Sequence, residues 1–250
     1  MRTAFLALFL TACARQDPPP APVSLCAEQR FEQAGFIVCS GEQVEIRSGM
    51  RSFADLQARL GPRAPRFAFA MNGGMFDEVG APIGLMIEDG RQVREINHRA
   101  GGGNFHLMPN GIFLLRKNGR AEVVTSDAFT AAPDIAFATQ SGPMLVIDGQ
   151  LHLRFDPDGD SRYVRNAVGI APDGTPLFVI TTDVVSFGKL ARFFRDRLKV
   201  RDALYLDGSV SSLWDPANGR MDDFVELGPM VVVFRRSAGS KPRREVPAIP

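Results

Sequence analysis

The chain is poor in the residues that most often signal a metal centre, a polar aromatic surface or an electrostatic partner. Its 250 residues include one Trp, two Tyr, three His and three Cys, and the formal net charge is +1. A near-neutral charge gives no support for nucleic acid or an acidic membrane surface as a partner, and we expect no nucleic acid to bind. The abundant aromatic residue is Phe, with 19 copies, which favours an apolar core over an aromatic binding surface.

Several motifs with well-understood chemistry are also missing. The sequence has no H-E-x-x-H run, no Cys pair with zinc spacing, no P-loop and no Gly-x-Ser-x-Gly turn. The acidic stretch 156–160 fails the EF-hand template, because Ser161 stands where that loop needs Gly and Ala167 where it needs Glu. The sequence gives no positive sign of a metal or a cofactor, and we expect none.

The first residues resemble a bacterial lipoprotein signal. The apolar run 4–10 is too short to span a bilayer, which needs about 20 helical residues, but it suits the core of an export signal. It is followed by Thr11, Ala12 and Cys13, similar to the box in which the Cys becomes the lipidated first residue. An ordinary signal peptide that happens to contain Cys13 is the alternative.

We therefore predict a lipoprotein signal peptide over 1–12 and lipidation of Cys13. A Pro-rich tether over 13–23 would follow. The expected location is the bacterial cell envelope, where the exported protein faces the periplasm and is held to the membrane by its lipid anchor.

The two remaining cysteines form a candidate disulfide. If Cys13 carries lipid, Cys26 and Cys39 are left as a pair, and an exported compartment permits a disulfide between them. Closing a loop of this size contributes roughly 3 kcal/mol in the chain-entropy model. Two free thiols are the alternative.

The pattern of apolar runs predicts one domain over 24–236, followed by a disordered tail over 237–250. We expect an α+β (mixed α/β) fold with strand-rich, largely antiparallel sheets, a few packed helices and a site at strand ends. Four hairpins are indicated by two-residue turns between short apolar runs, at Asp89-Gly90, Asn118-Gly119, Asp148-Gly149 and Asp173-Gly174.

Two helices are expected. The first is capped by Ser52, with Asp55 at its third position, and ends at Gly61-Pro62. The second runs over about 187–199, where apolar residues recur on one face. Together with the strands on either side, this second helix resembles a βαβ unit.

Three turns of small residues each follow an apolar run and suggest one binding site assembled from several strand ends. They are Asn72-Gly73-Gly74, Ser141-Gly142-Pro143 and the run Asp207-Gly208-Ser209-Val210-Ser211-Ser212. Gly lets the backbone approach a ligand closely. A carboxylate at a strand end, such as Asp207, lies where sheets of this kind tend to bind ligands. Taken singly, each segment could also be a plain turn.

Further candidates lie between these turns. Arg165-Asn166 directly precedes an apolar strand, and an Arg at a strand end can hold a phosphate through two parallel hydrogen bonds. A surface Arg is the alternative. Asp183 ends the next strand and is a second candidate carboxylate. The Gly-rich loop 101–106 could close over a ligand and carries Asn104 and His106, a possible acid–base group.

With these segments in this order, the chain resembles the phosphodiester glycosidase family over roughly residues 40–235. That family includes the lysosomal uncovering enzyme and many bacterial envelope proteins. The resemblance is carried by Asn72-Gly73-Gly74-Met75-Phe76, Gly103-Asn104-Phe105, Pro109-Asn110-Gly111, the segment 138–146, Arg165-Asn166-Ala167-Val168-Gly169 and the segment 206–212. The family often has a longer Gly run after the Asp of the last motif, whereas Ser209-Val210 stands there in this chain, as in one bacterial subgroup.

The resemblance implies cleavage of a sugar–phosphate diester, with release of a sugar and a phosphomonoester. A phosphate ester is already a good leaving group, so what is needed is stabilisation of the departing phosphate, for which Arg165 and backbone N–H groups are candidates. A carboxylate must stabilise the cationic sugar or activate water, and Asp207 is the first choice and Asp183 the second. The predicted substrate contacts are Asn72, Gly73, Gly74, Asn104, Ser141, Gly142, Asn166, Gly208, Ser209, Ser211 and Ser212.

Two other functions fit the same residues. A non-catalytic envelope lipoprotein could hold a polysaccharide with these turns and not hydrolyse it. A hydrolase of another class could use the same pocket.

Overall fold

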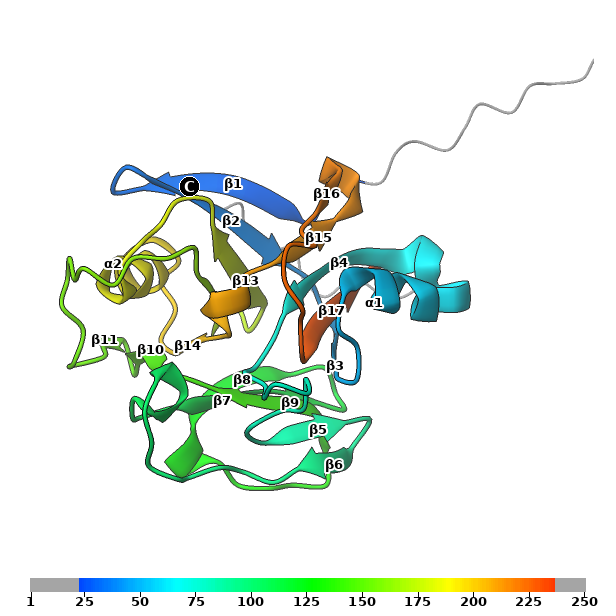
Figure 1. The fold of residues 1–250 in the computed structure, drawn as a ribbon, viewed down its shortest axis with the longest axis horizontal. Coiled ribbons are helices and arrows are strands. Elements are labelled where there is room, and N and C mark those ends of the chain that lie inside the picture. Colours follow the sequence, from blue (N-terminus) through cyan, green and yellow to red (C-terminus); the bar gives the residue numbers. More distant parts are fainter. Residues whose placement is uncertain (1–22, 237–250) are drawn as a thin grey trace, which may run out of the picture.

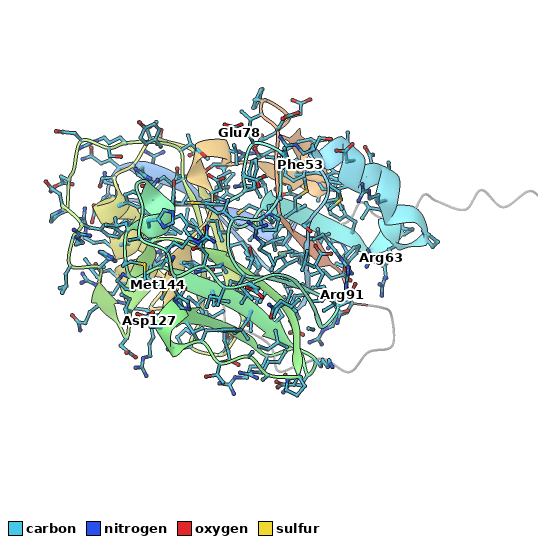
Figure 2. All side chains as sticks on the ribbon, turned by 60° about the horizontal axis from the view of Figure 1, so that its bottom comes forward. Phe53, Arg63, Glu78, Arg91, Asp127 and Met144 are labelled. Atoms are coloured by element: carbon cyan, nitrogen blue, oxygen red, sulfur yellow. A yellow bond between two sulfur atoms is a disulfide. The ribbon has the colours of Figure 1, made fainter. Side chains whose placement is uncertain are left out.

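The computed structural model describes residues 23–236, which form three antiparallel sheets and two short α-helices (Figure 1). The predictions of a signal peptide over 1–12, of lipidation at Cys13, of a tether over 13–23 (apart from Val23) and of a tail over 237–250 lie outside the described residues. No helix within the described part is long and apolar enough to cross a membrane.

The largest sheet has seven strands in the order β1-β2-β13-β12-β14-β10-β11. These strands are Cys26–Phe31, Ala34–Ser40, Pro176–Thr181, Asn166–Ile170, Ala203–Tyr205, Met144–Ile147 and Gln150–Leu151. A five-stranded sheet has the order β16-β15-β4-β17-β3, formed by Arg220–Met221, Leu213–Asp215, Phe67–Asn72, Met230–Phe234 and Gln43–Arg47. The other five-stranded sheet has the order β6-β5-β9-β7-β8, formed by Arg91–Arg94, Met86–Glu88, Ile135–Ser141, Gly111–Arg116 and Ala121–Thr125.

The helices begin where the sequence predicts. Helix α1, Phe53–Leu60, is capped by Ser52 Oγ, which accepts from the Asp55 N–H at 3.0 Å, while the Asp55 carboxylate accepts from the Arg51 N–H at 2.9 Å. Helix α2, Phe187–Arg192, continues as a π-helical turn, Phe193–Arg197. Short 3₁₀ turns cover Gly61–Arg66, Asn104–His106, Ser126–Ala128, Gly208–Val210 and Pro216–Asn218.

The predicted hairpins form at all four turns, and the strand-rich, antiparallel α+β prediction is confirmed in outline. Strand β11, which follows the Asp148-Gly149 turn, ends at Leu151, because the chain turns at His152, whose carbonyl accepts from the Phe155 N–H at 3.1 Å. The βαβ resemblance holds in a split form. Strands β13 and β14 flank α2 in sequence and run parallel to each other, but each pairs with β12, which lies between them.

The three sheets meet in one apolar core. Phe178 of β13 packs against Phe69 of β4 and Phe113 of β7, with ring centroids 6.0 and 5.6 Å apart. Helix α2 and its π-helical extension cover the outer face of the seven-stranded sheet, where Phe193 stacks on Phe36 at 3.9 Å. Because side chains from every sheet share this core, the ends of strands far apart in sequence are held at fixed positions.

The predicted disulfide is present. Cys26 and Cys39 face each other across the β1–β2 hairpin and are bonded, and they are 13 positions apart in sequence. Replacing both with Ser is expected to lower the free energy of unfolding by roughly 3 kcal/mol, because the unfolded chain regains loop freedom. Urea titration of oxidised wild type and of the variant measures this difference. Equal midpoints, with equal slopes, would contradict it.

Candidate active site

The side chain of Asn72 joins three segments that are far apart in sequence. Asn72 is 1 % exposed at the end of β4. Its Nδ2 donates to the carbonyl of Asp207 at 2.6 Å, and its Oδ1 accepts from Asn166 Nδ2 and from the Ser212 N–H, both at 2.9 Å. The first and third turns, together with the start of β12, are therefore one hydrogen-bonded unit.

The main chain of Asp207 is fixed from both sides by the turn after β4. Its N–H donates to the carbonyl of Gly73 at 3.0 Å, and its carbonyl accepts from Asn72. Its carboxylate accepts from the hydroxyl and the N–H of Ser209. Asp207 is 8 % exposed, and burial raises the pKa of its carboxyl above 3.8, although the Ser209 hydrogen bonds act in the opposite direction. A buried carboxyl with a perturbed pKa is typical of an acid–base group.

The second turn contacts the first at its glycine. A Cβ on Gly74 would lie 2.6 Å from the carbonyl of Gln140 and would overlap Thr139 Oγ1, so β9 passes directly beside this turn. The carbonyl of Pro143, which follows β9, accepts from the N–H of Tyr205 at 3.0 Å. Tyr205 lies two residues before Asp207. The structure thus brings all three turns to one place.

Buried donors without partners gather where these two turns meet. Ser141 Oγ is buried and has no hydrogen-bond partner. The N–H groups of Gly74 and Gly142, both in buried residues, find no acceptor among residues 23–236. Buried polar groups are almost always paired, with protein, water or ligand. By contrast, the N–H of Gly73 donates to the Pro229 carbonyl at 2.6 Å and is not available to a substrate.

The Gly74 contact leads to a specific prediction. A Gly74→Ala variant is expected to lose about 1–3 kcal/mol of stability, because the added methyl group meets backbone and not a flexible side-chain end. Differential scanning calorimetry measures the loss, and Gly102→Ala is the matched control, since nothing lies within 4 Å of a Cβ there. Equal melting temperatures for the two variants would show that the β4 turn does not press on β9.

Arg165 lies in the interior and not at the surface of the site. It is 1 % exposed, and its guanidinium donates to the carbonyls of Val185 and Ser161 and to the hydroxyl of Tyr205. The alternative of a surface Arg is wrong. The predicted two-pronged contact with phosphate is not formed by the described geometry, because these protein oxygens occupy the guanidinium.

Asp183 is exposed, and its carboxylate accepts from the Gly35 N–H at 2.7 Å. It follows β13, whose C-terminal end lies at the same end of the sheet as the C-terminal end of β14, which leads to Asp207. Strand β12 lies between them, so the two strands are about 10 Å apart. The structure does not bring Asp183 into hydrogen-bond contact with the Asn72 unit.

The other predicted residues lie around this centre. The hydroxyl of Ser211 has one proton to donate, and three acceptors lie within its reach: Gly208 O at 3.1 Å, Val164 O at 3.2 Å and Asn166 Oδ1 at 3.4 Å. Asn104 is exposed, but its neighbour Phe105 presents its carbonyl to Gly142. In the same loop, the His106 ring is hydrogen-bonded through Nδ1 to the Arg99 carbonyl at 2.7 Å.

Sequence reasoning missed two residues that shape the site. Tyr205 is 1 % exposed, and its hydroxyl lies directly beneath Gly208. Gln140 is also buried, and its side-chain oxygen accepts from the N–H groups of Leu85 and Asn97, while its nitrogen donates to the Ser126 hydroxyl. Tyr205 ends β14 after apolar residues, and Gln140 lies between two polar residues near the end of β9. A polar side chain near the end of a buried strand is the signal that the sequence offers for both.

The part of the chain that the structure describes contains no group of three or more His, Cys, Asp or Glu side chains that could hold a metal ion. The groups that the turns bring together are the buried carboxyl of Asp207 and a set of hydrogen-bond donors.

Comparison with known proteins agrees with this arrangement. The family model described as phosphodiester glycosidase matches residues 66–233, which contain all three turns. The chain belongs to the phosphodiester glycosidase family. This is a family of glycosidases, which are hydrolases, and membership supports that general kind of activity.

A relative by sequence extends the comparison. The Escherichia coli K12 protein described as uncharacterized protein YigE is 39% identical over 145 residues, which cover 58% of this chain and 57% of that protein. The chain thus spans little more than half the length of this relative.

Solved structures show the same fold. The catalytic domain of zebrafish N-acetylglucosamine-1-phosphodiester alpha-N-acetylglucosaminidase, auto-inhibited by its pro-peptide, aligns with a TM-score of 0.59 at 16% identity. That alignment covers 85% of this chain and 82% of the zebrafish chain. A hypothetical protein from Synechocystis aligns with a TM-score of 0.51 at 13% identity over 84% of this chain and 61% of the other.

Proposed function

We propose that the protein is an enzyme of the bacterial envelope that hydrolyses a sugar–phosphate diester and releases a sugar and a phosphomonoester. One observation carries the proposal. Unpaired donors at Gly74, Ser141 and Gly142 lie in the same assembly of turns as the buried carboxyl of Asp207. A phosphate diester supplies the acceptors that these donors lack, and its glycosidic carbon would then lie towards the carboxyl.

The proposed reaction follows from these groups. Water adds its oxygen to the anomeric carbon, the bond from that carbon to the phosphate oxygen breaks, and the phosphomonoester leaves with the electron pair. The free N–H and O–H donors stabilise the charge that grows on the phosphate. Asp207, once ionised, stabilises the cationic sugar or takes the proton from the attacking water. Asp183 is the second candidate for this role.

A non-catalytic polysaccharide-binding protein is the competing function. Binding alone needs no buried, ionisable carboxyl, since neutral donors and acceptors hold a glycan at lower desolvation cost. The raised pKa of Asp207 therefore favours the enzyme over the binding protein.

We further propose that the domain over 24–236 is exported and held to the membrane through Cys13. The tether over 13–23 would keep the site a short distance from the membrane surface. Incorporation of labelled palmitate into the wild type, and its loss in Cys13→Ser, tests this placement. Equal labelling of the two proteins would contradict it.

The activity is tested with a panel of sugar-1-phosphodiesters and purified wild-type protein. The panel includes N-acetylglucosamine-1-phosphodiesters, which the zebrafish relative's name gives as that enzyme's substrate. Appearance of free sugar and phosphomonoester in equal amounts supports the proposal. Binding of a panel member without any product would favour the polysaccharide-binding alternative.

A further inference from the structure

Arg165 is a buried cation without a carboxylate partner. It is among the largest fully buried side chains, at 1 % exposed, and no ion pair within residues 23–236 includes it. Burying an unpaired charge is costly. Arg165 directly precedes β12, and its other contacts must offset this desolvation cost.

Protein oxygens occupy most of the guanidinium. Of its five N–H donors, Nε donates to Val185 O at 2.9 Å, and Nη2 donates to Ser161 O and Oγ at 2.8 and 3.1 Å. Nη1 donates to Tyr205 Oη at 3.2 Å. One N–H remains on Nη1, and a two-pronged grip on a phosphate needs two parallel ones.

Aromatic rings enclose the same guanidinium. Its central carbon lies 3.7 Å from the ring centroid of Phe187, 5.5 Å from that of Tyr205 and 5.4 Å from that of Tyr163. These cation–π contacts offset part of the desolvation cost. They also fix the plane of the guanidinium, so that Nη1 points at the Tyr205 hydroxyl.

The Tyr205 hydroxyl supports the turn that carries Asp207. A Cβ on Gly208 would overlap Tyr205 Oη, so this hydroxyl is in contact with the backbone at Gly208. Burial raises the pKa of Tyr205 above 10, and the phenol stays protonated. Arg165, Tyr205 and Gly208 thus form a continuous chain of contacts that ends one residue from Asp207.

We propose that Arg165 and Tyr205 are positioning residues: Arg165 fixes the Tyr205 hydroxyl under Gly208, and this contact sets the place of the Asp207 carboxylate. Arg165 then acts without touching the phosphate. The inference rests on the proposed function and assigns these two residues a role in kcat and not in substrate binding.

Kinetics of Tyr205→Phe, Arg165→Lys and the double variant test the proposal. Each single variant is expected to lower kcat by about tenfold or more, because a shift of the turn misplaces the carboxylate, while KM changes by less than about twofold. The double variant should be no slower than the slower single one, since both changes break the same chain of contacts. The proposal would be overturned if the fold-loss of kcat in the double variant equalled the product of the two single losses. It would also be overturned if KM rose while kcat was retained.

Hydrogen–deuterium exchange gives a readout that does not depend on activity. In Tyr205→Phe, the amides of 206–211 should exchange faster, with those of β12 unchanged. Tyr163→Phe is the matched control, because Tyr163 also faces Arg165 but is 60% exposed and gives no support to Gly208. Unchanged exchange at 206–211 would overturn the positioning role. If the wild type cleaves no panel member, the proposed function fails, while the exchange result still decides the role of Tyr205.

Discussion

Replacing Asp207 with Asn is expected to lower kcat/KM for a sugar phosphodiester by about 10³-fold or more, the usual size of the effect when a group that acts only in the transition state is lost. The Asn side chain has the same shape and keeps an oxygen that accepts from Ser209, so the turn should stay in place. The measurement is product release by purified variant and wild type under the same conditions. Full activity in this variant would remove Asp207 from the mechanism.

A matched control for this variant lies at the opposite end of the sheet. Asp173→Asn changes a carboxylate in the β12–β13 turn, where Asp173 accepts only from the Thr175 N–H at 2.9 Å. Its activity should equal that of the wild type. If both variants lost activity to the same extent, the loss would come from a general change in charge and not from the site.

The raised pKa of Asp207 gives this prediction a pH dependence. If the ionised carboxylate is the active form, kcat/KM should fall on the acid side at a pH above 3.8, the ordinary value for Asp. Stability follows the opposite course, because a folded-state pKa above the unfolded one means that ionisation disfavours the folded state. Stability is therefore lost as the pH rises through the interval between these two values.

Asp207→Asn removes the loss of stability that ionisation of this buried carboxyl causes. At pH 7 the variant should melt at a higher temperature than the wild type. The difference should shrink as the pH falls towards 3.8. Calorimetry at several pH values measures the difference in melting temperature between variant and wild type. A difference that grows at low pH would contradict the raised pKa of Asp207.

Asn72→Ala is expected to have the largest effect on stability. It leaves the Ser212 N–H, the Asn166 Nδ2 group and the Asp207 carbonyl each short of a buried hydrogen bond. The Ser212 N–H is then unpaired, at a cost of about 1–3 kcal/mol. The Asn166 Nδ2 group and the Asp207 carbonyl keep the Asn72 carbonyl and the Val210 N–H as partners, and each loses one hydrogen bond of about 1 kcal/mol. The free energy of unfolding should therefore fall by about 3 kcal/mol or more. Urea titration measures the loss.

Two further variants make this test specific. Asn118→Ala is the control, because Asn118 lies in an exposed hairpin turn and its side chain accepts only from the Arg120 N–H. Asn72→Asp keeps the acceptor for Ser212 and Asn166 but turns the donor that faces the Asp207 carbonyl into an acceptor. It should lower activity more than stability. If Asn72→Ala were as stable as Asn118→Ala, the three turns would not depend on this side chain.

The sequence predicted the local structure of this chain well. Ser52 and Asp55 form the cap at the start of α1, and the Asn118-Gly119 turn joins β7 to β8. Both features depend on residues within four positions of one another, so their physics is visible in a short window of sequence. The Cys26–Cys39 pair could be predicted because the chain has three Cys, and lipidation of Cys13 would leave these two.

The role of Arg165 could not be predicted in the same way. Its position before a strand suggested an exposed phosphate ligand, whereas the structure buries it between Phe187 and Tyr205. Those rings are 22 and 40 positions away in sequence. Side-chain burial depends on which distant elements pack together, and no local pattern carries that information.

By itself, the sequence determined the hairpins, both helix starts and the three turns whose order identifies the family, because turn and cap preferences are local properties of a few residues. Only the tertiary structure decided what those turns do. Packing of three sheets on one core brings Asn72, Asn166 and Asp207 into contact. Among the described residues it leaves the donors of Gly74, Ser141 and Gly142 unpaired, and it occupies the donor of Gly73 and all but one of the guanidinium donors of Arg165. Whether a donor is unpaired or hydrogen-bonded depends on which acceptors lie within about 3 Å of it. Those acceptors belong to residues far away in the chain.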